Sequence, residues 1–227
     1  MSPARPHRIK SMTSIETKTM SDEQIRDETF AERARLSALL AELTPDQWAA
    51  PSLCEGWRVR EVVAHITMPF RLSGRQFAVG MLAARGNFNR MADRYARRDA
   101  TALSAEQLAA CLRDNIRHPW KPPGGGFRGA LSHDVIHGLD ITVGLGLDQR
   151  VPGERLRIVL DGVRPRQIRY FGANLDGVQL RATDLDWSFG SGTAVTGTAQ
   201  DLLLVLCGRT LPPGRLQGAP SDRFTRA

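Results

Sequence analysis

Helical periodicity over residues 21–144, followed by a change of pattern, is the feature that most limits the fold of this chain. Apolar residues recur at helical spacing from Ile25 to Leu43, and again in a segment that begins near residue 58, at Leu103–Ile116 and at residues 129–144. Four helices with one apolar stripe each can bury those stripes only against one another. We therefore expect an up-and-down four-helix bundle over residues 21–149.

Start and stop signals support these helices. Ser21 followed by Gln24 forms a capping-box pattern ahead of the first helix. Thr44 followed by Pro45 repeats the signal, because proline is favoured at the first helical position. The stretch "WKPPGGGF" at residues 120–127 breaks the helical pattern before the last helix.

The pattern becomes that of an α+β domain after residue 150. "VQLRATDLDWSFG" alternates apolar and polar residues as a strand does, "GTAVTGTA" reads as a second strand, and "GSG" between them predicts a hairpin turn. "AQDLLLVLCGR" predicts a helix that Gly208 closes. We expect a small α+β domain at residues 150–218, an α+β class overall, and tails at residues 1–20 and 219–227, the first of them disordered.

Charge and composition exclude several classes of protein. The net charge is +7, but residues 1–20 and 212–227 supply +5 of it, so no basic stripe marks a nucleic-acid-binding surface. No apolar run is long enough for a membrane span, and the N-terminus lacks a signal-peptide core. We expect a cytoplasmic monomer or homodimer that binds neither nucleic acid nor membrane.

The three cysteines predict no disulfide framework. Cys54, Cys111 and Cys207 are odd in number, widely spaced and without a CxxC pair. Buried, reduced thiols are the simplest interpretation. Cys54 is the least ordinary of them, because its turn lies close in sequence to His65.

Histidines provide the strongest sign of chemistry. His133 and His137 are four residues apart, so on a helix they lie on one face and can chelate a divalent ion. A short HxxxH pattern alone is more often a pair of solvated or core-satisfied histidines. His65, on an inward-facing position of another predicted helix, makes a three-histidine metal site in the bundle core the better interpretation.

The stretch "HDVIH" also resembles the HExxH of zinc metalloproteases, in which a glutamate serves as the base. Asp134 is one methylene shorter than that glutamate, and the third histidine comes from an upstream helix, so a protease is disfavoured. Asp140 lies three residues after His137. It either accepts a ring N–H from that ligand or caps the end of the helix.

Three segments together resemble one known family. "SLCEGWRVREVVAHI", "HDVIHGLDI" and "LRATDLDWSFGSGTAVTGTAQDLLLVLCGR" resemble the two metal motifs and the C-terminal domain of the mycothiol-dependent maleylpyruvate isomerase family, a branch of the DinB-like metal-binding bundles. The resemblance extends over about residues 22–218. It implies a DinB-like bundle that holds a zinc-type ion and binds the thiol mycothiol at that ion.

The resemblance carries over to single residues. His65 matches the upstream metal ligand and His137 the last, whereas His133 stands where the isomerase branch typically has a carboxylate. Three histidines are more similar to the DinB-like S-transferases, which puts a maleylpyruvate substrate in doubt. Zinc is the expected metal, although imidazole also suits nickel and iron.

These residues predict a metal-dependent and mycothiol-dependent enzyme. It would be an S-transferase or a cis–trans isomerase acting on a small electrophile, with an acidic substrate as one option. Trp57, Arg71, Arg75 and Arg209 are candidates for binding the thiol or the substrate, since arginine pairs well with carboxylates. No single catalytic residue can be named. The alternative is a metal-containing binding or regulatory protein without catalytic activity.

Overall fold

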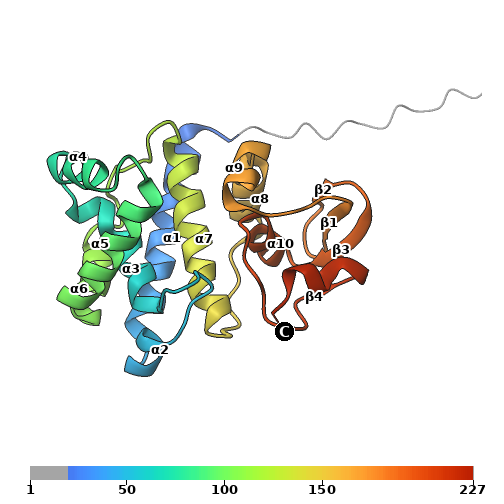
Figure 1. The fold of residues 1–227 in the computed structure, drawn as a ribbon, viewed down its shortest axis with the longest axis horizontal. Helices are drawn as coiled ribbons and strands as arrows, with labels where there is room; N and C mark the ends of the chain where they lie inside the picture. Colours follow the sequence, from blue (N-terminus) through green and yellow to red (C-terminus); the bar gives the residue numbers. More distant parts are fainter. Residues whose placement is uncertain (1–19, 227) are drawn as a thin grey trace, which may run out of the picture.

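The computed structural model describes residues 20–226, and the helical pattern of residues 21–144 forms a bundle in it (Figure 1). The expected tail at residues 1–20 lies outside the described residues, apart from Met20. The helices of this part are α1 (Asp22–Glu42), α2 (Pro45–Ala49), α3 (Val59–Arg71), α4 (Gly74–Ala83), α5 (Phe88–Ala102), α6 (Ala105–Asp114) and α7 (Gly126–Gly144).

The four expected helices correspond to α1, α3, α6 and α7. The two caps predicted from the sequence are also present. Ser21 and Gln24 form a reciprocal capping box at the start of α1, and Thr44 caps α2 with Pro45 at its first position. Leu36, Val62, Ile66, Leu108 and Ile141 are almost completely buried, one or two from each helix of the bundle. The apolar stripes therefore meet in one core, as the sequence predicts.

Two further helices belong to this part of the chain. The segment expected to form a single second helix ends at Arg71, and α4 starts anew behind Ser73, which forms a capping box with Gln76. Helix α5 packs along α3. Its buried face consists of Met91 and small residues such as Ala96, so it lacks the stripe of large apolar side chains by which the other helices were predicted.

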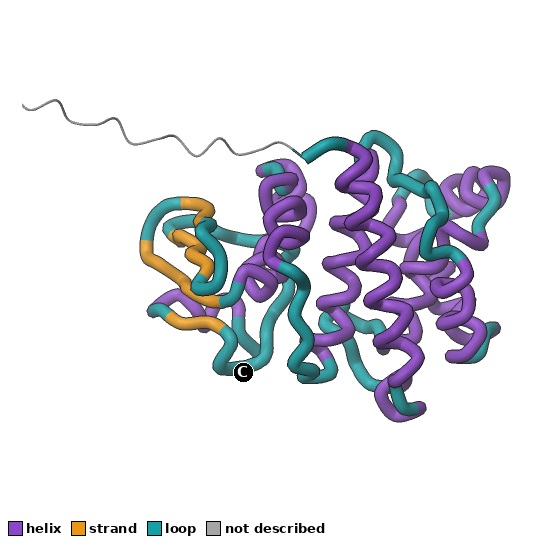
Figure 2. Tube along the Cα trace, turned by 180° about the vertical axis from the view of Figure 1, so that it is seen from behind, coloured by secondary structure: helices purple, strands orange, loops and turns teal. Residues whose placement is uncertain are grey.

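Helix α7 is the wall shared by both domains (Figure 2). Ile141 faces the bundle core, whereas Leu131, Val135, Leu139 and Val143 join the core of the C-terminal domain. The face of α7 that packs in the C-terminal domain was not predicted from the sequence. Few positions of a helix that buries apolar residues on two sides can be polar, so the polar residues in the middle of α7 are candidates for a functional role.

The C-terminal domain surrounds a four-stranded sheet. Its elements are α8 (Gly153–Gly162), α9 (Pro165–Phe171), β1 (Val178–Ala182), β2 (Ser188–Gly190), β3 (Thr193–Gly197), α10 (Ala199–Leu206), β4 (Leu216–Gln217) and the 3₁₀ helix η1 (Ala219–Phe224). The strand order is β2-β1-β3-β4. Helix α10 packs against α7, α8 and β1, and Gly208 follows its end in the left-handed conformation, as expected.

Two expectations for this domain are wrong. "GSG" connects β2 to β3, but these strands do not pair: β1 lies between them, antiparallel to β2 and parallel to β3. The hairpin instead joins β1 to β2, and the chain reverses direction at residues 183–186. Residues 219–226 are not a tail either, since η1 buries Phe224 and the Leu211 amide donates to the Phe224 carbonyl.

An ion network fastens the two domains together. Arg155 of α8 pairs with Glu28 and Glu32 of α1, at 2.8 and 2.7 Å, and Arg35 also donates to Glu32. The side chain of Glu32 is fully buried. No helix in the described part of the chain is long and apolar enough to cross a bilayer.

Candidate metal centre

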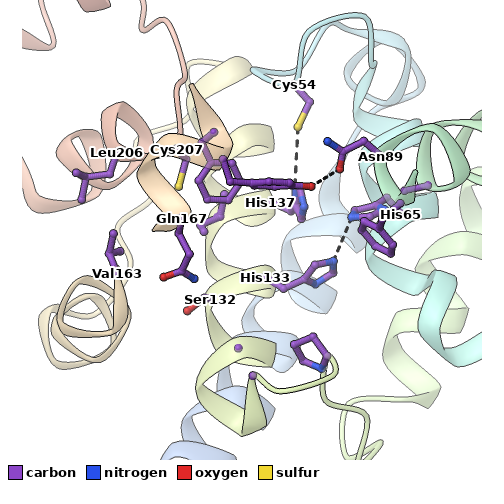
Figure 3. A pocket seen from close by; sticks show the side chains of 18 of the residues that line it. Cys54, His65, Asn89, Ser132, His133, His137, Val163, Gln167, Leu206 and Cys207 are labelled. Carbon is purple, nitrogen blue, oxygen red and sulfur yellow. Dashed lines mark hydrogen bonds between the residues drawn. The ribbon is translucent and has the colours of Figure 1, made fainter. Parts of the chain in front are cut away.

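The three predicted histidines meet at the inner end of a cavity between the two domains (Figure 3). His65 comes from α3, and His133 and His137 come from successive turns of α7. One ligand nitrogen of each lies within 4.8 Å of the others, and the Nε2 atoms of His65 and His133 are 3.3 Å apart. The geometry is that expected from the helical spacing, now with the third histidine in place.

Carboxylates hold two of the rings from behind. His133 Nδ1 lies 2.9 Å from Asp134 Oδ1, and His137 Nδ1 lies 3.0 Å from Asp140 Oδ2. An ionised carboxylate can only accept, so each Nδ1 donates and each Nε2 is left with a free lone pair. That is the tautomer a metal ligand needs.

Each carboxylate is held in turn by an arginine, Arg33 being fully buried and Arg209 half-buried. Arg33 Nε donates to Asp134 Oδ2 at 2.8 Å, and Arg209 Nε donates to Asp140 Oδ1 at 2.7 Å. The same Arg–Asp–His order therefore occurs twice, once from α1 and once from the C-terminal domain. Asp140 was expected to orient His137, whereas the roles of Asp134 and Arg33 were missed.

His65 differs from the other two because its Nδ1 is buried without a partner. Only 7% of the residue is exposed, and burial, followed by the neighbouring His137 and His133, lowers its pKa well below the usual value. A neutral imidazole with an unsatisfied nitrogen is costly to bury. That cost would remain with an ion bound at His65 Nε2, so the fit of a zinc-type ion rests on the three ligand nitrogens that lie within 4.8 Å of one another.

Asp140 is also the centre of a cluster that includes Cys54. The Cys54 Sγ donates to Asp140 Oδ2 at 2.9 Å and lies 3.8 Å from His137 Nδ1. Burial and the Asp140 charge raise the pKa of the Cys54 thiol, and burial raises the pKa of Cys207 to about 12. Although burial opposes ionisation of Asp140, hydrogen bonds from His137 and Arg209 bring its pKa below the usual range.

The cavity has a volume of about 970 Å³ and is open at one end. Trp57 lines it, with its ring centroid 5.2 Å from that of His65, and Trp57 Nε1 donates to Asp93 at 2.7 Å. Arg209 lines it as well. Both residues therefore border the cavity.

Arg71 and Arg75, also expected to bind substrate, do not line the cavity. The Arg71 guanidinium pairs with Asp99 and donates to the Ala64 carbonyl, which fixes the end of α3. Arg75 is exposed on α4. The sequence placed both on a single helix, whereas Arg75 belongs to α4, which begins after the break that follows Arg71.

The buried histidines should make the metal-free protein sensitive to pH. Burial lowers the pKa of His65 and His137, so the unfolded chain binds protons below about pH 6.5 that the folded chain refuses. The contribution of these neutral histidines to the free energy of unfolding is therefore fully present above about pH 6.5. It is lost as the pH falls from there towards their lowered pKa values in the folded protein. Melting temperatures in chelator between pH 7.5 and 5 should show this decline, and the slope should be shallower in His65→Asn. Equal slopes for both proteins would contradict it.

Comparisons with known proteins agree with this architecture. A family model described as the mycothiol maleylpyruvate isomerase N-terminal domain matches residues 29–120, which include His65 but not His133 or His137. An uncharacterized protein of Mycobacterium tuberculosis, present in strains CDC 1551 and H37Rv, is 30% identical over 213 residues, covering 79% of this chain and 82% of that protein.

Solved structures give the same result for the fold. The crystal structure of the mycothiol-dependent maleylpyruvate isomerase aligns with a TM-score of 0.60 at 13% identity, covering 89% of this chain and 94% of that one. A histidine-to-alanine mutant of the same enzyme aligns with a TM-score of 0.61 over the same shares. The alignment extends over both domains, so the arrangement of bundle and α+β domain is common to both proteins.

Proposed function

Because this chain belongs to the mycothiol-dependent maleylpyruvate isomerase family, we propose that it is a metal-dependent enzyme that uses mycothiol to attack a small electrophile. The reaction would be an S-transfer or a cis–trans isomerisation. The observation that carries the proposal is the convergence of three imidazoles at the inner end of an open cavity, with the Nδ1 atoms of His133 and His137 each bound to a carboxylate.

The donor set suits this chemistry. Three neutral histidines leave the full charge of a divalent ion uncompensated, and such an ion, when bound, lowers the pKa of a thiol beside it so that thiolate exists at neutral pH. We propose zinc as the metal, since nitrogen ligands and a position left open are typical of catalytic zinc sites. Asp134 and Asp140 would fix the rings in the ligating orientation, and Trp57 would flank the bound thiol.

The protein's own thiols are poorly suited to the role of nucleophile. Cys54 is hydrogen-bonded to a carboxylate that keeps its proton on the sulfur, and Cys207 is buried with a raised pKa. The nucleophile therefore has to come from a cosubstrate. We propose a reducing, cytoplasmic setting, in which Cys54, Cys111 and Cys207 would remain free thiols.

A Cys54→Ser variant should accordingly keep its metal and at least half of its activity. Serine can donate the same hydrogen bond to Asp140, and no thiolate is lost because none is formed at neutral pH. The measurement is the mycothiol-dependent rate together with metal content per chain. A variant that is inactive while holding its metal would show that the nucleophile is borne by the protein.

The proposal is tested by loading the purified protein with zinc and following the loss of free mycothiol in the presence of an electrophile such as a bimane. We expect consumption that is faster than the spontaneous reaction, is abolished by chelator and returns with zinc. A maleyl compound run alongside tests isomerisation without net loss of thiol. If a broad panel of electrophiles shows no acceleration with metal bound, the protein is a metal-containing binding protein instead.

A further inference from the structure

We propose that the cavity selects an electrophile whose non-reacting part is neutral and apolar, in preference to a dicarboxylate. This inference rests on the proposed function and concerns the substrate of the same site. It departs from the acidic substrate that the arginines of the sequence suggest. Three features of the cavity lead to it: an apolar wall, an aromatic rim and the pairing of its cations.

The apolar wall lies across the α7 histidines from His65 (Figure 3). It is built by Ile136 of α7, Val159 and Val163 at the end of α8, and Leu206 of α10. Ile136 and Val163 remain partly exposed to the cavity, whereas Val159 and Leu206 are almost completely buried behind them. A substrate that reacts beside the histidines would place its other end against these side chains, where burial of apolar surface is favourable and burial of a charge is costly.

An aromatic rim forms the outer part of the cavity. Phe88, Tyr170 and Phe171 all line it, and 43%, 60% and 37% of their surfaces are exposed. Exposed large apolar residues gathered at one opening commonly mark a binding site. The Tyr170 hydroxyl donates to Asn89 Oδ1, so α9 and α5 touch across this opening.

The cations of the cavity are poorly placed to bind a dicarboxylate. Of the described residues that line it, only Arg166 and Arg209 are basic. Arg209 directs Nε and Nη2 to the two oxygens of Asp140 and Nη1 to the Cys207 carbonyl. Turning it towards a substrate would leave the fully buried Asp140 carboxylate without its counter-charge, which is strongly unfavourable.

The side chains around a bound ion add no net positive charge to it. Arg166 is exposed on α9. Glu55 and Asp93 also line the cavity, and Asp93 pairs with Arg97, so the formal charges of Arg166, Arg97, Glu55 and Asp93 cancel. A single carboxylate could pair with Arg166 at the entrance, but a second one would meet the apolar wall or another carboxylate. The volume of about 970 Å³ leaves room for both a large thiol and an apolar substituent.

The test compares two alkenes with the same carbon skeleton around the double bond, the neutral and more apolar diethyl maleate and the dianion maleate. In each reaction the thiol sulfur forms a C–S bond with one alkene carbon, and the thiol proton goes to the other, so no oxidant or reductant is needed. With zinc-loaded protein and mycothiol, we expect the ratio of enzymatic to spontaneous rate to be at least 10-fold higher for the diester. A ratio that is equal, or higher for maleate, would overturn the proposal.

Binding of saturated analogues separates substrate class from catalysis. Diethyl succinate and succinate cannot react, and the fluorescence of Trp57 in the cavity reports their binding to zinc-loaded protein. We expect the diester to bind at least 10-fold more tightly, and equal or tighter binding of succinate would refute the inference. If the diester binds more tightly but neither alkene is turned over, the proposed function fails and the selectivity of the cavity stands.

A carboxylate introduced into the apolar wall of the cavity tests whether the diester binds there. Val163→Asp should reduce diester binding at least 10-fold while metal content stays the same, because it puts a carboxylate where the ester group would pack. The matched control is Val79→Asp on α4, a valine that is 61% exposed and does not line this cavity. Unchanged diester binding in a folded, metal-loaded Val163→Asp protein would show that the wall does not contact the substrate.

Discussion

His133→Ala is expected to abolish stoichiometric metal binding and, with it, mycothiol-dependent activity, while the protein stays folded. The Nε2 atoms of His65 and His133 are 3.3 Å apart and share one site, so two histidines alone would remain to hold the ion. We expect zinc affinity to fall by more than about 100-fold, since even the loss of a residue that only orients a ligand costs roughly 10- to 100-fold. Elemental analysis and competition with a chromophoric chelator measure the change.

The matched control for this variant is His118→Ala. His118 is also a half-buried histidine of the bundle, but its ring packs on Phe70 and its Nδ1 accepts from the Trp120 amide. It does not belong to the three-histidine group, so its replacement should leave the metal content unchanged. Full zinc occupancy in His133→Ala would mean that the ion, if one binds, is held elsewhere.

Asp140→Asn is expected to cause the largest combined loss, in stability and in metal affinity. Its carboxylate accepts hydrogen bonds from His137, Cys54 and Arg209, and no part of its side chain is exposed. Removing one partner of a buried ion pair costs about 3–5 kcal/mol. For a protein of this size that corresponds to a melting temperature lower by roughly 10 °C. Metal affinity should fall by roughly 10- to 100-fold, because His137 loses the group that orients it.

Thermal melting and zinc titration of Asp140→Asn separate the two effects. The control is Asp148→Asn, whose side chain is 97% exposed and lies 3.8 Å from Arg150. Such a surface pair contributes at most about 1 kcal/mol, so both measurements should match those of the parent protein. If Asp140→Asn behaves like this control, Asp140 neither orients His137 nor links the domains.

The sequence predicts those parts of the molecule that have a local signature. Capping residues and apolar spacing identify α1, α3, α6 and α7, and the four-residue interval between His133 and His137 places both on one face. Helix α5 escaped detection because its buried face consists largely of alanine. The strand order was not predicted because a glycine turn can join two strands that pair with each other and can also join two strands that lie on either side of a third, as β2 and β3 lie on either side of β1.

The support behind the histidines could not be predicted from the sequence. Arg33 lies 101 residues from Asp134, and Arg209 lies 69 residues from Asp140, so only the folded chain shows that they pair. Asp134 directly follows His133, and adjacent helical residues ordinarily point in different directions. Its contact with His133 Nδ1 depends on side-chain rotamers, which spacing does not reveal. The same applies to Arg71, whose pairing with Asp99 removes it from the binding site.

The double burial of α7 bears on how such chains can be recombined. Its Leu131, Val135 and Leu139 are packed in the C-terminal core, although the helix is continuous with the bundle and carries two of the three histidines. A chimera that exchanges the C-terminal part with that of a relative would therefore mismatch one face of α7 if it were spliced near residue 150. A splice at the glycine loop of residues 124–126 would transfer two metal ligands and the apolar wall of the cavity together, but it would exchange the face of α7 that packs on α1 and α3.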